Sequence, residues 1–272
     1  MLELAPPDRK ARAGFVATAA NMGGLGCGPL LSGLLAEYAP HPLTLPYLVH
    51  LVLLAASFAV LRALPETVPG ARPLRTARPR RPSLPPQVRG VFVPAGLAAF
   101  AGFSLLGVFT SVSPAFLAED VDVHNHAAVG AIVCLAFFAS TAGQLLVPRL
   151  GAARAIPLGC LVLIAGLGLL ALSLATGTLA PLVLAALVGG TGQGMGLRGA
   201  VDRLADAAPA DQRGGVLSAL FVVAYFGISV PVIGIGLLAD PLGLTHAGLV
   251  FTAAMAVLAA ASGLYLLRRR SA

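Results

Sequence analysis

The sequence contains few charged residues and few cysteines, and each shortage excludes a class of protein. Only 11% of the 272 residues are charged and 57% are hydrophobic, so the mean hydropathy of +0.89 lies far outside the range of soluble domains. The three cysteines, Cys27, Cys134 and Cys160, form no close pair and offer no disulfide framework or metal-ligand spacing. We therefore expect a membrane protein without a bound metal.

Motifs of catalytic sites are also lacking. No apolar run contains paired carboxylates or a His-x-x-x-His pattern, and no glycine-rich phosphate loop precedes a basic residue and a Ser or Thr. Residues 190–196, GTGQGMG, resemble a dinucleotide-binding loop, but they lie within an apolar run and follow no predicted strand. We expect these glycines to pack helices together, and we expect neither an enzyme nor a cofactor.

Long apolar runs are what the sequence has instead. A helix of about 20 residues crosses the hydrocarbon core of a bilayer, and none of the runs alternates apolar and polar residues as a membrane β-barrel would. The prediction is an all-α membrane protein with about eight transmembrane helices. A cleaved signal peptide is disfavoured, because the first run is too long and a second follows after a short gap. The eight runs are residues 14–37, 43–64, 91–117, 127–147, 155–176, 179–197, 215–239 and 245–267.

The positively charged residues are confined to the N-terminus, the C-terminus and the neighbourhood of every second gap between the apolar runs. All eighteen basic residues fall before the first run or near the gaps after the second, fourth, sixth and eighth runs. Since basic loops stay in the cytoplasm, we predict a multi-pass protein of the cell membrane with both termini and the long middle loop cytoplasmic. The arginines lie at helix ends without interleaved aromatic residues, so orientation explains the isoelectric point of about 10.2 better than nucleic-acid binding does. Charges near the other gaps are acidic: Glu37, Glu119, Asp120, Asp122 and Asp240.

The segment between the second and third runs differs from the rest of the chain. Residues 65–89 contain seven prolines and six arginines and have little to bury. This composition predicts a flexible or extended cytoplasmic linker over residues 65–90. The linker would separate a part with two spans, residues 1–64, from a six-helix bundle, residues 91–272. Binding of anionic lipid headgroups by this polybasic strip is an alternative role that stays open.

Two stretches about 202 residues apart resemble each other. Pro29 aligns with Pro231, and the Gly-Leu-Leu-Ala-Glu that ends at Glu37 aligns with the Gly-Leu-Leu-Ala-Asp that ends at Asp240. Such a repeat indicates two related halves, which recur in secondary transporters. Because six spans follow the linker and only two precede it, equal halves would imply four further spans at the front.

The first run carries the most specific motif. It consists of Ala20, Gly24, Gly28, Pro29, Ser32 and Gly33. This pattern resembles the fifth-helix signature of drug/proton antiporters in the major facilitator superfamily, with Ser32 in place of the first of two final glycines. Side chains this small at spacings of four let a second helix approach closely, and a proline removes a backbone donor and bends the helix. We therefore expect the close contact on the face of Gly24 and Gly28.

Two further stretches carry the same resemblance, which covers the whole chain. Pro65, Glu66 and Thr67 resemble the end of the sixth helix of that family. The residues Gly143, Arg149, Gly151 and Arg154 resemble its loop after the eighth helix, although the acidic residue of that loop is missing. The resemblance implies two helices of the N-terminal half and a complete six-helix C-terminal half.

Polar side chains inside the runs are candidates for the lining of a cavity. His50 is the clearest ionisable one and could titrate near physiological pH, but a packed, hydrogen-bonded histidine is the alternative. For the uncharged ones, the alternative is a hydrogen bond between helices. The candidates are Asn21, His50, Gln144, Gln193 and Tyr225.

The resemblance implies an efflux carrier that moves a small organic molecule, as drug/proton antiporters do, by rocking two bundles around a midplane site. Its partners would be the lipid bilayer, the substrate and possible coupling protons, with no nucleic acid. Two other hypotheses stay open. In one, the chain is a non-transporting truncated fragment whose remaining spans lie in the upstream reading frame. In the other, it is a multi-span structural or assembly protein without a substrate.

Overall fold

The computed structural model describes residues 10–63, 84–210 and 212–268, and every regular element among them is helical. This confirms the predicted all-α class. Helices are expected in lipid because each backbone N–H and C=O must find a partner within the protein. The elements are α1 (Lys10–Tyr38), α2 (Leu45–Ala63), the 3₁₀ turn η3 (Pro86–Val88), α3 (Arg89–Ser111), α4 (Ser113–Glu119), α5 (His126–Leu150), α6 (Ala152–Thr176), α7 (Leu179–Ala207), α8 (Arg213–Leu242) and α9 (Leu244–Arg268).

Within the described residues, seven helices are long and apolar enough to cross a membrane, against the eight expected. They are α2, η3 with α3, and α5 to α9. The remaining expected span, α1, is 29 residues long but is not among the seven. Its glycines, Asn21 and Pro29 lower its mean hydropathy.

The expected span 91–117 is wrong as one helix, because the structure divides it at Val112. Pro114 follows the division, and a proline ring clashes with the carbonyl group four residues earlier, here that of Thr110. The expected end of the sixth run at residue 197 is also too early, since α7 continues to Ala207. Arg198 and Asp202 support this extension with a 2.9 Å ion pair one helical turn apart.

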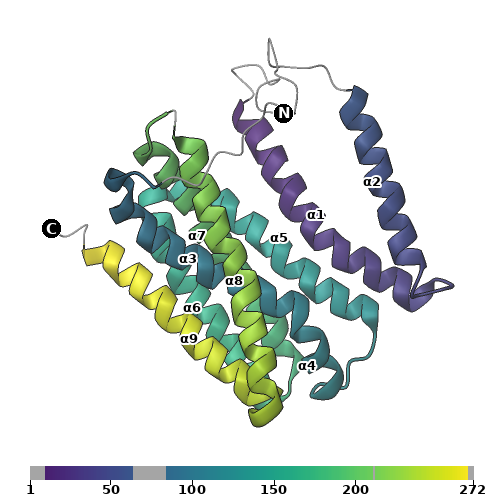
Figure 1. The fold of residues 1–272 in the computed structure, drawn as a ribbon. Helices are drawn as coiled ribbons and strands as arrows, with labels where there is room; N and C mark the ends of the chain where they lie inside the picture. The colour runs from purple at the N-terminus through teal and green to yellow at the C-terminus, as the bar shows by residue number, and fades with distance from the viewer. Residues whose placement is uncertain (1–9, 64–83, 211, 269–272) are drawn as a thin grey trace.

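Helices α3 and α5 to α9 form the main bundle, in which α7 packs against α3, α5 and α6 (Figure 1). The glycines within residues 190–196 explain how α7 can pack against several helices at once. Gly190 and Gly194 lie against backbone atoms of α5, whereas Gly192 lies against backbone atoms of α6. A side chain at Gly190, Gly192 or Gly194 would force the helices apart, so the expected packing role is confirmed for these three, whereas a Cβ atom on Gly196 would have no neighbour within 4 Å.

The first two helices lie on one side of this bundle. Figure 1 shows α1 alongside α5 and α2 farther out. No residue of α2 is buried. The expected linker over residues 65–90 falls mostly outside the described residues, as do Pro65, Glu66 and Thr67. The expected repeat would pair α1 with α8, which are similar in length and contain Pro29 and Pro231.

Helix α1 begins and α9 ends at the same end of the bundle (Figure 1). We call this the basic end, because arginines such as Arg89, Arg149 and Arg268 lie near it. The opposite end, where α1 gives way to α2 and α4 to α5, carries Glu37, Glu119, Asp120, Asp122 and Asp240 and is called the acidic end.

Candidate functional site

A cavity of about 460 Å³ lies toward the acidic end, between α1 and the main bundle. Its walls come from the second half of α1, the end of α3, helix α4, the segment before α5 and the first half of α5. Most of the lining is apolar, and two imidazoles, of His124 and His126, add polarity. Three motif residues of α1 also line it: Pro29, Ser32 and Gly33.

Glycines bring α1 and α5 together beside this cavity, and we call their contact the α1–α5 seam. A Cβ atom on Gly33 would meet backbone atoms of His126, and one on Gly130 would lie 3.0 Å from Leu30 Cα. A Cβ atom on Gly26 would lie 2.8 Å from Phe137 Cβ. At Gly33 and Gly130 the two backbones therefore approach each other so closely that a side chain at either position would not fit.

The expectation that Gly24 and Gly28 form the close contact is wrong. A Cβ atom on either of these glycines would have no neighbour within 4 Å. Both glycines instead line a second hollow of about 370 Å³ between α1 and α2, together with Cys27 and His50. The small residues of the motif thus serve two surfaces, with Gly33 on the seam and Gly24 and Gly28 on the hollow.

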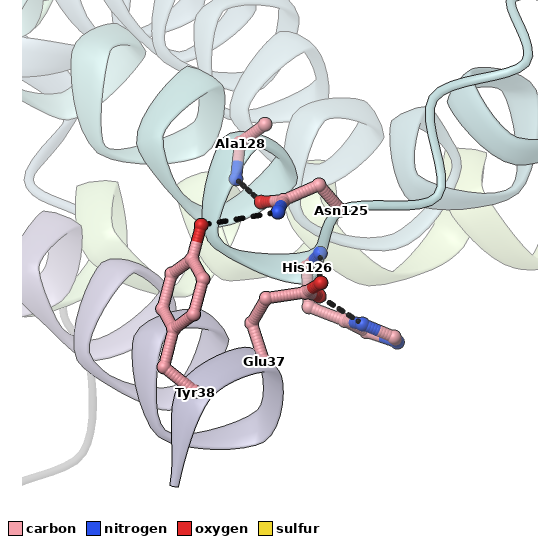
Figure 2. Close-up of polar contacts among 5 residues, drawn as sticks. All are labelled: Glu37, Tyr38, Asn125, His126 and Ala128. Atoms are coloured by element: carbon pink, nitrogen blue, oxygen red, sulfur yellow. Dashed lines mark hydrogen bonds and ion pairs between the residues drawn. The ribbon is translucent and has the colours of Figure 1, made fainter.

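Polar contacts close the seam at the acidic end (Figure 2). Glu37 Oε2 accepts a hydrogen bond of 2.8 Å from the backbone N–H of His126, and Nδ1 of the same residue lies 2.9 Å from that oxygen. Asn125 Oδ1 caps α5 by accepting from the N–H of Ala128 at 2.8 Å. The amide of Asn125 also donates to the hydroxyl of Tyr38 at 3.2 Å. In the sequence, Glu37 stands out only as a loop charge, and this cluster was not predicted.

A second polar group lies inside the bundle. Ser140 Oγ on α5 donates to Gln193 Oε1 on α7 at 2.6 Å, which is a hydrogen bond between helices. The amide nitrogens of Gln144 and Gln193 are buried and have no hydrogen-bond partner in the described part of the chain. Buried donors of this kind are costly unless a water or a solute occupies them.

The other predicted lining residues lie elsewhere. Tyr225 is 62% exposed and packs edge-on against Phe103, with ring centroids 6.3 Å apart. His50 is exposed toward the hollow between α1 and α2. Ala20 is exposed, and the side chain of Asn21 is outside the described structure.

The stretch between α5 and α6 forms a sharp turn at the basic end. Gly143 packs against the backbone of Thr191, and Gly151 ends α5 with a φ of +77°, which favours glycine. Arg149 and Arg154 flank the turn with exposed side chains.

The described residues contain no group of three or more His, Cys, Asp or Glu side chains placed to bind a metal ion. Cys27, Cys134 and Cys160 are free thiols.

Comparisons with known proteins concern the family and the fold. The sequence profile described as Major Facilitator Superfamily matches residues 1–230. A solved structure named "Structure of a bacterial metal transporter" is similar, with a TM-score of 0.65 and 16% sequence identity over 99% of this chain and 68% of that chain. A similarity at so low a sequence identity is evidence only of a shared fold. A search of curated proteins finds no match.

Proposed function

The chain belongs to the Major Facilitator Superfamily, and on that premise we propose that it exports a small organic molecule from the cell in exchange for protons. Membership supports transport across a membrane. The finer proposal is supported by the resemblance of the α1 motif to that of drug/proton antiporters. The cell membrane, with both termini cytoplasmic, belongs to the same proposal and is supported by the arginines at one end of the bundle.

One observation carries the proposal: a largely apolar cavity opens where α1 meets the main bundle, and it is lined by the motif residues Pro29, Ser32 and Gly33. A cavity between two packed units is where a small solute is held when the units rock against each other. Apolar walls with a few polar groups suit an organic molecule better than an ion.

Accumulation of fluorescent organic cations and dyes in cells that lack their own exporters tests this proposal. Cells that express the chain should retain less of at least one compound, and a protonophore should abolish the difference. Ala36→Phe fills the cavity and should restore retention, whereas Ala253→Phe, on an exposed position of α9, should not. Unchanged retention of every compound, both by the chain alone and by the chain joined to the four helices proposed below, would contradict the proposal.

A metal ion is the second cargo to test, because the similar solved structure is that of a metal transporter. The donor set argues against it, since the described residues offer no group of three metal-binding side chains. Uptake of radioactive divalent cations into the same cells decides between the two cargoes.

The working carrier, we propose further, includes four additional helices packed on α1 and α2. Two observations support this: α2 has no buried residue, and the similar structure extends beyond the matched region, with 68% of its chain covered. If the chain alone changes no accumulation but a fusion to four such helices does, the chain by itself is a non-transporting fragment. An assembly protein would change accumulation in neither form.

A further inference from the structure

Two of the three cysteines meet across the α1–α5 seam, although they are far apart in the sequence. Cys27 lies on α1, next to the seam residue Gly26, and Cys134 lies on α5. A Cβ atom on Gly26 would lie 3.6 Å from Cys134 Cα and 3.3 Å from its carbonyl oxygen. The thiol groups of Cys27 and Cys134 are close enough to interact through a side-chain hydrogen bond. The seam therefore places two free thiols side by side.

The register of the seam explains why these thiols meet. Leu30 packs against Gly130 of α5. One turn earlier on α1, Gly26 meets Cys134, which lies one turn later on α5. A disulfide needs Cα atoms about 4.4–6.8 Å apart, and packing of two helices through glycines favours such a separation. Rotation of the side chains can then bring the two sulfur atoms into bonding distance.

The two cysteines differ in what can reach them. Cys27 is exposed and lines the hollow of about 370 Å³ between α1 and α2. Cys134 is only 4% exposed. Because oxidation of a thiol depends on access to it, a small oxidant attacks Cys27 first. The neighbouring thiol of Cys134 is then the group in position to react with the oxidised sulfur.

We propose that Cys27 and Cys134 are a redox pair, in which a peroxide oxidises Cys27 and Cys134 then closes a disulfide between α1 and α5. First, the sulfur of Cys27 attacks one oxygen of hydrogen peroxide. The O–O bond breaks as the S–O bond forms, and the thiol proton leaves with the other oxygen as water. Next, the sulfur of Cys134 attacks the sulfenic sulfur. The S–O bond breaks as the S–S bond forms, and the Cys134 proton leaves with the hydroxyl group as a second water. The peroxide gains the two electrons that the thiols lose.

The disulfide would join the first two helices to the main bundle by a covalent bond. The other contacts described along this seam are non-covalent: glycines packed against backbone atoms, and hydrogen bonds at the acidic end. A reducing dithiol would reverse the link. This modification goes beyond the proposed transport function and does not depend on it.

The test oxidises the purified full chain and asks whether its two parts have become joined. After treatment with hydrogen peroxide, the remaining thiols are blocked with N-ethylmaleimide and the chain is cut at a protease site placed within residues 72–81. On a denaturing gel without reductant, the two parts should migrate together, and dithiothreitol should separate them. Mass spectrometry should find the peptides of Cys27 and Cys134 joined with the loss of two hydrogen atoms. The free thiols per chain should fall from three to one.

Three variants serve as controls. Cys160→Ala should keep the link, because Cys160 is 3% exposed and its sulfur lies 3.8 Å from Ser262 Oγ on α9. Cys134→Ala should abolish the link. The matched control combines Cys27→Ser with Gly28→Cys, which moves the exposed thiol by one residue to a position whose Cβ atom meets nothing within 4 Å. Its joined fraction should fall to the level of Cys134→Ala.

The redox pair is overturned if the parent chain stays in two parts after oxidation, or if Cys27 gains oxygen atoms without forming joined peptides. Equal joining in the Gly28→Cys control would also overturn it, because proximity across the seam would then not decide the product. Size-exclusion profiles before oxidation establish that each variant is folded. Export by the parent chain without any joined product would support transport and reject the redox pair.

Discussion

Gly33→Ala should loosen α1 from α5, and its effect follows from the distances at the seam. The new Cβ atom would overlap the carbonyl oxygen of His126 and lie 3.0 Å from its carbonyl carbon and 3.3 Å from Ala127 Cα. These are backbone atoms inside a helix, so the helices must separate. Overpacking of this kind costs about 1–3 kcal/mol, offset in part by the roughly 0.5–1 kcal/mol that alanine gains over glycine within a helix.

The net loss of about 1–2 kcal/mol corresponds to a midpoint lowered by about 2–8 °C, at about 2–4 °C per kcal/mol for a chain of this size class. The assay is the fraction of protein that stays in the folded size-exclusion peak in detergent after heating. A local readout accompanies it: Cys134, 4% exposed beneath Gly26 on the same seam, should react faster with N-ethylmaleimide when α1 shifts.

Gly28→Ala is the matched control, with the same change in the same helix. A Cβ atom there meets nothing within 4 Å, so only the helix-propensity gain remains and the midpoint should stay constant or rise. If both variants lose stability equally, or if Gly28→Ala alone exposes Cys134, the assignment of the seam to Gly33 is wrong.

Three further predictions concern other parts of the chain. Asn125→Ala should lower stability by about 1 kcal/mol, measured by the same heating assay, because it removes the cap that accepts from Ala128. Gln144→Met should raise stability by about 1 kcal/mol, since it removes a buried amide donor without a partner; a lower midpoint would mean that the amide is satisfied by water or solute. A protease site placed within residues 72–81 should be protected in intact cells and cut after permeabilisation, and cleavage from outside would reverse the predicted orientation.

Hydropathy predicted the positions of most helices because the bilayer sets their length. The expected span 43–64 corresponds to α2 (Leu45–Ala63), and the expected span 245–267 corresponds to α9 (Leu244–Arg268). The errors came from local chemistry that hydropathy ignores. Pro114 divided one run, and the Arg198–Asp202 pair allowed α7 to continue past the point where charges begin.

The cavity could not be predicted in the same way, because it is built by contacts between distant segments. Gln144 and Gln193 are polar groups within apolar runs and so can be picked out from the sequence, and the structure places both inside the bundle, with Gln193 hydrogen-bonded to Ser140. His124 and His126 lie in a short polar segment, where nothing in the sequence marks them as cavity residues, yet both line the cavity. Only the packing of α1 on α5 distinguishes them from ordinary loop residues.

The glycines of α1 show why a correct motif led to the wrong face. Successive residues of a helix are about 100° apart, so positions two apart lie on nearly opposite faces. Gly24, Gly28 and Ser32 follow one face, and Gly26, Gly33 and Glu37 follow the other, because spacings of seven and four return to the same side. Helix α1 thus has two faces with small residues. The face that forms the seam is the one that meets α5, where Gly130 packs against the backbone of α1. The same periodicity places Glu37 on the seam face one turn beyond Gly33, so the helix that packs through its glycines also carries its carboxylate to the start of α5.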